Sequence, residues 1–377
     1  MLSILRDGFK MKLWGSVGRE AWSVGCGGIT TDREWDSELM QFVDANFYQT
    51  AAYAKVHKRG TGIARWVLTE AGRSVAMMQA FTVEMRRVGL RFAYVFRGPV
   101  WKRDNGKIEK RAEEIAEWMA TEIVKREGWY LRLVPYEFSS DEVKLSDVLR
   151  RCGFLWRPSS VGAETLIMNL EGTADEVLGD CRRKWRQTLT KALRNDLSVN
   201  IGTSEELIEG ACRLNREMYR RKRIPEFVVA EEFLQAQRFL PEEAKLSTVL
   251  VQSSRKEYLA AVTWASVGRF ALPLIAATSN LGVSVSASYV AWWKMVETLI
   301  EREKRWLDLG GINKKRNLGG YTFKTGLAGK RGKIEEFVGE LDGACSPWAS
   351  TCVKMLDVMN ALRRAWRVKV RRSGRLL

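Results

Sequence analysis

The chain has few of the residues on which many kinds of enzyme chemistry depend. His57 is its one histidine, and none of its six cysteines forms a Cys-x-x-Cys pair with another. Zinc sites in proteins are built mainly from these two residue types, so we expect no metal site and no other bound cofactor. A catalytic proton relay through histidine has no candidate except His57.

Three common nucleotide-binding and hydrolase motifs are also missing. The sequence contains no Gly-x-x-x-x-Gly-Lys-[Ser/Thr] loop, no Gly-x-Gly-x-x-Gly and no serine within Gly-x-Ser-x-Gly. The absence of these motifs argues against ATP- and NAD-dependent chemistry and against a hydrolase nucleophile of that kind.

Long apolar runs are absent as well. The longest, residues 270–277, has eight residues, whereas a membrane-spanning helix needs about 18. The first residues are charged and lack the apolar core of a signal peptide. The scattered cysteines are typical of small buried hydrophobic residues in a reducing compartment. We therefore expect a cytoplasmic protein with no transmembrane segment.

The composition is that of a folded, strongly basic protein. The chain has 377 residues, of which 46% are hydrophobic and 28% are charged, and its net charge is +17. This length favours two domains. The charge favours a polyanionic partner: a nucleic acid, an anionic membrane face or a phosphorylated substrate. A generically basic protein with no such partner is the alternative.

The order of predicted elements repeats after about 180 residues. The first unit is predicted to have strands at 66–69, 74–81, 91–100 and 130–135 and helices at 107–127 and 145–151. The second is predicted to have strands at 246–252, 258–266, 269–278 and 306–309 and a helix at 286–304. Each unit reads as an antiparallel meander, a crossover helix and a strand parallel to the one before the helix. This order predicts an α/β protein with mixed (α+β) sheets and two tandem domains like the GNAT (acyl-CoA N-acyltransferase) fold.

We expect domain 1 to cover residues 1–163 and to be completed by a C-terminal helix within 345–377. Domain 2 is expected to cover residues 164–344. It would begin with a strand at 165–170 and a helix at 174–195.

Basic clusters occur at 182–186, near 219–223 and at 363–372. Each contains one aromatic residue: Trp185, Tyr219 or Trp366. Cations interleaved with aromatic side chains suit contacts to a nucleic-acid backbone and stacking on bases. The alternative is three solvated helix faces whose tryptophans point into the core.

A glycine-rich segment at residues 306–329 is the most informative part of the sequence. It contains a short apolar strand, three glycine clusters and an aromatic-rich stretch, predicted to be a strand, that carries Lys324. Clustered glycines indicate positive φ angles or a close approach to the backbone. Lys324, flanked by Tyr321 and Phe323, is therefore a candidate for a fixed cation in a binding cleft. The alternative is a solvated lysine on an ordinary β-turn.

Six strings spread over most of the chain carry a family resemblance. They are Phe47-Tyr-Gln-Thr-Ala-Ala-Tyr53, Tyr94-Val-Phe-Arg97-Gly-Pro-Val100, Thr165-Leu-Ile-Met-Asn-Leu170, Lys184-Trp-Arg-Gln-Thr-Leu-Thr-Lys-Ala192, Trp306-Leu-Asp308-Leu-Gly-Gly311 and Phe323-Lys324-Thr-Gly326-Leu-Ala-Gly329. Together they resemble the Fem (FemABX) family of aminoacyl-tRNA-dependent peptidyltransferases, which build peptidoglycan cross-bridges. The chain is similar to the compact type without a coiled-coil arm.

The resemblance implies a function and a set of site residues. The reaction would transfer an amino acid from a charged tRNA to an amine of a peptidoglycan precursor, nucleotide- or lipid-linked, or of an antibiotic intermediate. Lys324 would be the catalytic residue and would stabilise the developing oxyanion. The substrate-binding residues implied are Phe323, Arg221, Lys58, Tyr94, Arg97 and Asp308. The tRNA-binding residues expected from the basic clusters are Arg182, Arg183, Lys184, Arg186, Arg363, Arg364, Arg371 and Arg372. The protein is expected to be a monomer.

Two other interpretations remain open. An acyl-CoA-dependent N-acyltransferase would need a backbone cradle for the pyrophosphate, at residues 101–106 or 279–284. Neither segment matches the [Gln/Arg]-x-x-Gly-x-[Gly/Ala] pattern of such enzymes. A non-catalytic RNA-binding protein would leave Lys324 exposed and away from any channel.

Overall fold

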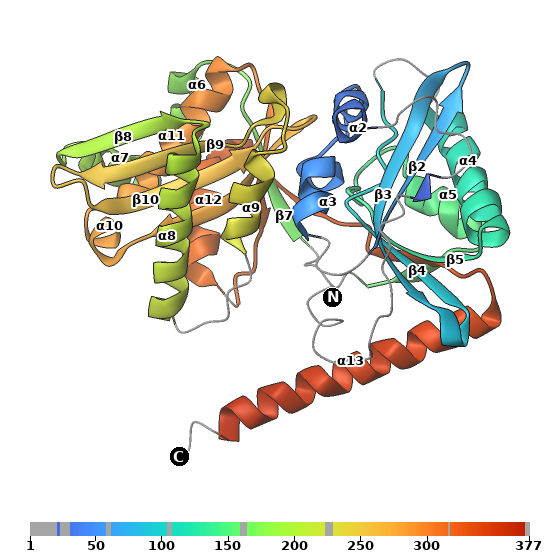
Figure 1. The fold of residues 1–377 in the computed structure, drawn as a ribbon. Coiled ribbons are helices and arrows are strands. Elements are labelled where there is room, and N and C mark those ends of the chain that lie inside the picture. The colour runs from blue at the N-terminus through green and yellow to red at the C-terminus, as the bar shows by residue number, and fades with distance from the viewer. Residues whose placement is uncertain are drawn as a thin grey trace.

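The computed structural model describes residues 21–22, 31–57, 62–103, 108–158, 164–222, 229–315 and 317–373. The side chains of 21–22 and 363–373 lie outside this description. Two seven-stranded sheets stand side by side, and the helix α3 lies between them (Figure 1).

The first sheet has the strand order β1-β2-β3-β4-β5-β14-β6. Its strands are Ala21–Trp22 (β1), Gly62–Glu70 (β2), Arg73–Met85 (β3), Leu90–Phe96 (β4), Trp129–Val134 (β5), Glu340–Gly343 (β14) and Leu155–Arg157 (β6). Apolar side chains alternate between its two faces, as the two-residue period of a strand requires. In β4, Ala93 and Val95 pack on one face, while Phe92 and Tyr94 pack on the other. Both faces are therefore covered.

Helices cover the two faces of this sheet. On the outer face lie α4 (Ile108–Trp118), its π-helical continuation η3 (Met119–Arg126) and α5 (Leu145–Arg151). On the face toward the second sheet lie α2 (Asp32–Leu39), the short turn η1 (Phe47–Gln49) and α3 (Ala51–His57). A further 3-10 turn, η2 (Arg86–Val88), forms the tip of the β3–β4 hairpin.

The second sheet has the order β13-β7-β12-β11-β10-β9-β8. Its strands are Gly332–Glu336 (β13), Glu164–Asn169 (β7), Trp306–Gly311 (β12), Phe270–Thr278 (β11), Tyr258–Ala265 (β10), Ser247–Ser253 (β9) and Leu197–Gly202 (β8). One face carries α6 (Ala174–Asp180), α7 (Arg183–Ala192), α11 (Ala287–Glu301) and α12 (Leu318–Ala328). The other carries α8 (Glu205–Lys222) and α9 (Ala230–Gln237). The short turns are η4 (Glu242–Ala244), α10 (Asn280–Ser284) and η5 (Gly329–Arg331).

The predicted duplication is confirmed at the level of strand direction. Strands β2, β3 and β4 form an antiparallel meander, and β5 is parallel to β4. Strands β9, β10 and β11 repeat that meander, and β12 is parallel to β11. Strand β14 belongs to the first sheet although it lies in the range assigned to domain 2. The exact domain boundaries stay a prediction.

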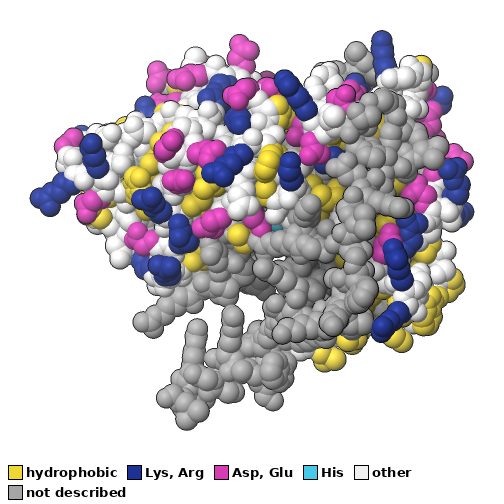
Figure 2. Space-filling model, in the orientation of Figure 1, with side chains coloured by type: hydrophobic (Ala, Val, Ile, Leu, Met, Phe, Trp, Pro, Cys, Tyr) yellow, Lys and Arg dark blue, Asp and Glu magenta, His cyan; other side chains and the backbone are white. Residues whose placement is uncertain are grey.

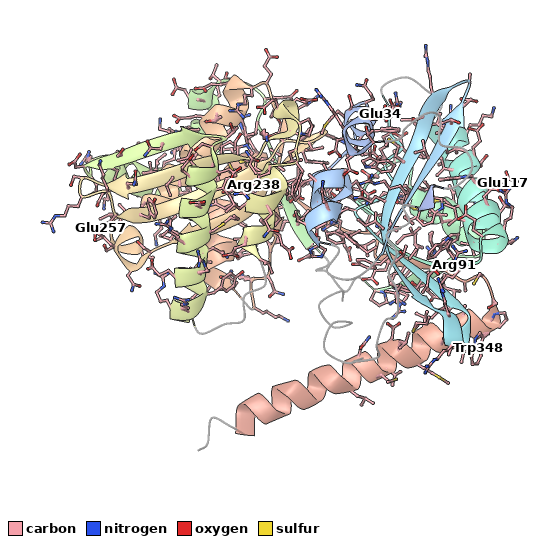
Figure 3. All side chains as sticks on the ribbon, viewed as in Figure 1. Glu34, Arg91, Glu117, Arg238, Glu257 and Trp348 are labelled. Carbon is pink, nitrogen blue, oxygen red and sulfur yellow. The ribbon has the colours of Figure 1, made fainter. Side chains whose placement is uncertain are left out.

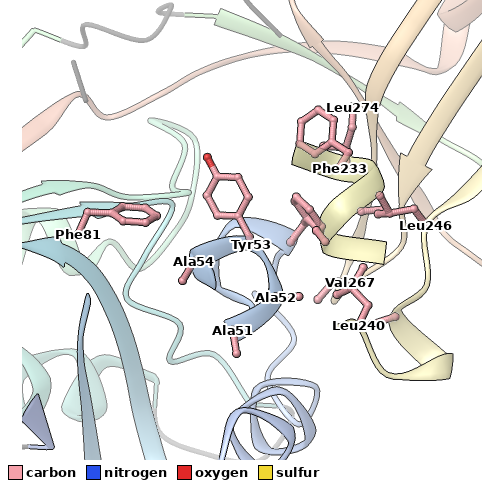
Figure 4. Packing of buried hydrophobic residues seen from close by; sticks show 14 of the residues in the cluster. Ala51, Ala52, Tyr53, Ala54, Phe81, Phe233, Leu240, Leu246, Val267 and Leu274 are labelled. Atoms are coloured by element: carbon pink, nitrogen blue, oxygen red, sulfur yellow. The ribbon is translucent and has the colours of Figure 1, made fainter. Parts of the chain in front are cut away.

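One hydrophobic cluster joins the two sheets. Ala52 of α3 points toward Val267, which follows β10, and Tyr53 of α3 and Phe233 of α9 belong to the same buried cluster (Figure 4). A cluster shared in this way holds the two sheets in one fixed relation, because separating them would expose its apolar surface to water.

Gly268 makes close contact possible at the same seam. Its φ is +70°, and a Cβ atom there would lie 2.1 Å from the carbonyl oxygen of Ala45. The neighbouring Arg269 amide donates to the Val43 carbonyl at 2.8 Å. No larger residue fits at position 268 without moving the two parts of the chain apart.

Two predicted elements are wrong in detail. The segment that carries Lys324 is the helix α12 and not a strand: the Asn317 side chain caps it by accepting from the Gly320 amide, and Gly329 ends it. The predicted helix at 174–195 is two helices, because Cys181 has an extended ψ of 151° and interrupts the helix between α6 and α7.

The C-terminal helix α13 (Pro347–Ser373) leaves the first sheet beside the β3–β4 hairpin and runs underneath the molecule (Figure 1). Its Asp357 pairs with Arg132 of β5 and with Arg157 of β6. Within the described part of the chain, no helix combines the length and the apolar character needed to cross a membrane.

Candidate active site

The two sheets differ at their parallel strand pairs: β4 and β5 stay paired along their length, whereas β11 and β12 separate. Strands β4 and β5 pair over six residues, from Arg91↔Trp129 to Phe96↔Val134. Strands β11 and β12 pair at Phe270↔Trp306 and Ala271↔Leu307 and then separate. A gap between the strand before the crossover helix and its parallel neighbour therefore exists in the second unit, beside β12.

Lys324 lies at the end of β12. Its Nζ donates to the carbonyl oxygen of Gly311 at 3.0 Å, so the ammonium is held at the residue where the strand ends. Gly310 has a φ of +77°, and a Cβ atom there would lie 3.7 Å from Nζ. Glycine thus permits both the turn of the strand and the approach of the lysine.

The lysine side chain is half-buried, and the negative charge of Asp308 acts on it. Burial lowers the pKa of Lys324 below that of a free lysine, and the negative charge of Asp308 acts in the opposite direction. Among the described residues, Gly311 is the one hydrogen-bond acceptor of this ammonium, so its other N–H groups can stabilise negative charge on a ligand.

Asp308, on β12, is buried and accepts hydrogen bonds from three directions. The Thr165 hydroxyl and the Gly310 amide, the latter at 2.8 Å, donate to Oδ1. The Tyr136 hydroxyl donates to Oδ2 at 2.5 Å. These donors stabilise the ionised carboxylate and fix its position.

Tyr136 connects this carboxylate to the first unit. It follows β5, and burial together with Asp308 raises its pKa well above the ordinary value of a tyrosine, so it remains a hydrogen-bond donor. The guanidinium of Arg97 lies 5.0 Å from the centre of the Tyr136 ring and 4.0 Å from that of Phe337. A cavity of about 10 Å³, room for roughly one water molecule, lies here between Tyr48, Arg97 and Phe270.

The structure thus brings together three residues predicted from sequence, Lys324, Asp308 and Arg97. It adds Tyr136 and Thr165, which sequence reasoning did not select as site residues. The signal available for Tyr136 was its place just after the parallel strand of the first unit, which corresponds to Gly310 and Gly311 in the second.

Phe323, also predicted, points away from the ammonium into a ring cluster. Its ring lies 4.9 Å from that of Tyr289 and 5.6 Å from that of Trp292, both on α11. Phe323 therefore fixes α12 against α11. Tyr94 is buried within the first sheet, stacked on Phe96, whereas Lys324 lies on α12 of the second unit.

Arg221 lies on α8, near the far end of β11. It donates to the Thr278 carbonyl and to the Asn280 side chain, each at 2.9 Å. A cavity of about 510 Å³ opens beside it, lined by Arg213, Arg216, Glu217, Arg220, Arg221 and Asn280. Lys58 lies outside the described residues.

The basic cluster at the start of α7 lies next to α12. Arg182, Arg183 and Lys184 are exposed, and the Arg182 amide donates to the carbonyl of Gly326 at 2.9 Å. Arg186 is half-buried and donates to the carbonyl of Gly179. The Arg182 backbone therefore contacts α12 at a residue two positions from Lys324, less than one helical turn away.

Trp185 is not exposed for stacking on a base. It is buried, with 3% of its surface accessible, and packs against Tyr289 and Phe323. For this residue the structure supports the alternative that the tryptophan points into the core. Arg363, Arg364, Arg371 and Arg372 belong to α13, in the part whose side chains lie outside the description.

The segment 279–284, where an acyl-CoA enzyme would hold pyrophosphate, forms the short helix α10. Two of its backbone amides already have partners: Ser279 donates to the Leu259 carbonyl at 2.9 Å, and Gly282 donates to the Ser279 hydroxyl at 3.0 Å. A Cβ atom on Gly282 would lie 2.0 Å from the Leu259 carbonyl oxygen, so this turn is pressed onto β10.

Charges of both signs are interspersed over the visible face of the second unit (Figure 2). The net charge of +17 therefore does not make this face uniformly positive. For binding a polyanion, the local basic clusters named above matter more than the total charge.

The fold recurs in solved structures of low sequence identity. FemX matches with a TM-score of 0.69 at 16% identity, over 84% of this chain and 96% of FemX. A conserved protein of unknown function from Bacteroides thetaiotaomicron matches with a TM-score of 0.53 at 11% identity, over 83% of this chain and 97% of the other. A tandem GNAT protein from the clavulanic acid biosynthesis pathway has a TM-score of 0.45 at 12% identity, over 84% and 97%. No protein-family model and no curated protein matches the sequence. The chain has a mixed α/β fold of two GNAT-like units in tandem, and FemX shares this fold.

Proposed function

We propose that the protein is an aminoacyltransferase that moves an amino acid from aminoacyl-tRNA to an amine. The acceptor is a peptidoglycan precursor or a related amino-bearing compound, such as an antibiotic intermediate, and the product is an amide. The observation that carries this proposal is the half-buried ammonium of Lys324, held at the open end of β12 beside the buried carboxylate of Asp308.

The reaction requires little from the protein except position and charge. The acceptor amine attacks the ester carbon, a C–N bond forms, and the carbonyl oxygen becomes an oxyanion that receives a hydrogen bond from Lys324. The ester C–O bond then breaks, and the proton lost by the amine ends on the ribose hydroxyl of the tRNA. An ester is already activated, so proximity supplies much of the rate and no histidine base is needed.

The exposed cations of α7 support the proposal that the donor is a charged tRNA. Arg182, Arg183 and Lys184 lie beside α12, so a nucleic-acid end bound by them can place its terminal ester near Lys324. The engaged amides of Ser279 and Gly282 speak against a pyrophosphate cradle at this position.

Two arginines in different parts of the molecule support an anionic acceptor. Arg221 borders the arginine-lined cavity on α8, which suits a phosphate group of a precursor. Arg97 stands on the first-unit side of Asp308, among aromatic rings.

A direct test uses the purified full chain, a total pool of charged tRNA and candidate acceptor amines, with mass spectrometry of the products. We expect an acceptor heavier by one amino-acid residue, dependent on charged tRNA. Modification by acetyl-CoA without tRNA would instead establish the acyl-CoA alternative, and no modification by either donor would favour a binding protein.

Binding of tRNA is expected to weaken steeply with salt, because each phosphate contact releases counterions. We expect the affinity to fall by at least about tenfold between low and physiological salt. The variant Arg182→Gln with Lys184→Gln should show a shallower slope in filter binding. The matched variant Arg255→Gln with Lys256→Gln, two exposed cations on the β9–β10 turn, should keep the slope. If both variants show the same dependence of tRNA affinity on salt, the cations of α7 do not contact the tRNA.

The pH dependence of transfer should report on Asp308. The oxyanion contact needs protonated Lys324, so the rate should fall as the pH rises through the pKa of that lysine. Since the Asp308 carboxylate raises this pKa, Asp308→Asn should move the alkaline fall of kcat to lower pH. Tyr136→Phe, which keeps the charge, should leave the position of that fall nearly unchanged. If Asp308→Asn leaves the pH profile unaltered, the Asp308 carboxylate does not influence the pKa of the lysine that controls transfer.

A further inference from the structure

We propose that the outward face of α13, together with the tip of the β3–β4 hairpin, docks on the surface of an anionic lipid bilayer. The proposal is independent of the transfer reaction. It rests on an exposed apolar stripe, on cations at both of its ends and on the rigid attachment of the helix.

One face of α13 is anchored to the first unit. Ala349, Val353 and Asn360 are buried on that face. Asp357 accepts from Arg132 at 3.0 Å and from Arg157 at 2.6 Å. The first half of the helix is therefore held in a fixed orientation, and its opposite face is presented outward.

That opposite face is apolar and exposed. Its residues are Trp348, Met355, Val358, Met359 and Leu362, whose exposed fractions are 58%, 60%, 58%, 41% and 65%. At 100° per residue these five positions fall within an arc of about 100° on the helix. Exposed Thr351 falls within the same arc, and the other five positions of the arc are apolar. Single exposed apolar residues are ordinary, but several on one face of a helix mark an interaction surface.

Cations flank the stripe. At one end, Trp348 donates to the carbonyl of Val88 at 2.9 Å, which places it against the hairpin tip (Figure 3). Arg86 and Arg87 of that tip are exposed. At the other end the helix backbone continues through residues 363–373, a stretch with six Lys and Arg residues and no acid. Hydrophobic side chains gather near the start of α13 in the space-filling view (Figure 2).

The charge pattern selects the partner. Between 347 and 362 the charged residues are Lys354, which is exposed, and Asp357, which is paired on the anchored face. The apolar arc thus carries no carboxylate, and a second copy of the chain would bring the same cations against it. An anionic bilayer offers both a negative surface for the cations and an apolar layer for the stripe, and a tryptophan suits the boundary between them.

The test is co-sedimentation of the full chain with vesicles. We expect binding to vesicles of equal parts phosphatidylglycerol and phosphatidylcholine, and little binding to phosphatidylcholine alone. Met355→Gln with Leu362→Gln should lower the partition coefficient by at least about tenfold. Arg86→Gln with Arg87→Gln should weaken binding at low salt more than at high salt.

A matched control is Ile201→Gln with Val283→Gln, two apolar residues of the second unit that are 43% and 60% exposed. This variant should bind vesicles as the unmodified protein does. All the changed side chains are exposed, so thermal unfolding should be nearly unaltered in every variant.

Three results would overturn the proposal. They are failure of the unmodified protein to sediment with anionic vesicles, undiminished binding by the Met355/Leu362 variant, and a dimer in solution that this variant converts to a monomer. The last would make the stripe an interface between copies of the chain.

Discussion

Lys324→Ala is expected to lower the turnover of amide formation by at least about tenfold while leaving tRNA binding nearly intact. In the proposed reaction the ammonium at the end of β12 contacts a charge that develops in the transition state, so its loss should affect kcat more than ground-state binding. Single-turnover transfer from charged tRNA and filter binding of the same tRNA measure the two effects separately.

Two further variants sharpen this experiment. Lys330→Ala removes the next lysine along the chain, whose side chain is 83% exposed, and should transfer normally. Lys324→Arg keeps the positive charge but replaces a compact ammonium by a planar group, so it should restore activity only in part. If Lys324→Ala transfers as fast as the unmodified protein, this lysine has no part in the chemistry.

Arg132→Met is expected to destabilise the protein by about 3–5 kcal/mol, the usual cost of removing one partner from a buried ion pair. Arg132 is 1% exposed and donates to both oxygens of Asp342 at 2.7 Å. It also donates to Asp357 of α13 at 3.0 Å. Removal leaves the buried Asp342 carboxylate with fewer donors than its charge requires. Urea unfolding measures the loss of stability.

The same network gives this prediction a control and a second readout. Arg157→Met removes an outer arginine whose side chain is 35% exposed, so it should destabilise the protein less. Since Asp357 ties α13 to β5, Arg132→Met should also make the helix more sensitive to limited proteolysis. Equal stability of the two variants would mean that Arg132 is not the centre of the network.

The element order could be predicted from the sequence because most strands and helices are strongly periodic. The helix Leu145–Arg151 has the predicted bounds, and β5, β9, β10 and β11 lie within one or two residues of theirs. These segments carry alternating or continuous apolar residues bounded by glycine, proline or charged turns.

Prediction failed where local signals conflicted. Around Lys324 the paired glycines and the aromatic residues favoured a strand. The Asn317 cap and the packing of Phe323 and Leu327, four residues apart, against α7 and α11 favour a helix. The packing is tertiary, so no local signal expressed it.

The sequence by itself determined the duplicated α/β order, the scarcity of histidine and the candidates Lys324, Asp308 and Arg97. The duplicated order and the scarcity of histidine follow from residue type and period along the chain. Clustered glycines mark Lys324, and the roles of Lys324, Asp308 and Arg97 are what the resemblance to the Fem family implies. The tertiary structure alone decided which of the two sheets opens, that Tyr136 of the first unit donates to Asp308 of the second, and that Trp185 is buried while one face of α13 is not. These features depend on contacts between residues more than a hundred positions apart, or on how the units pack together, and local periodicity carries no information about either.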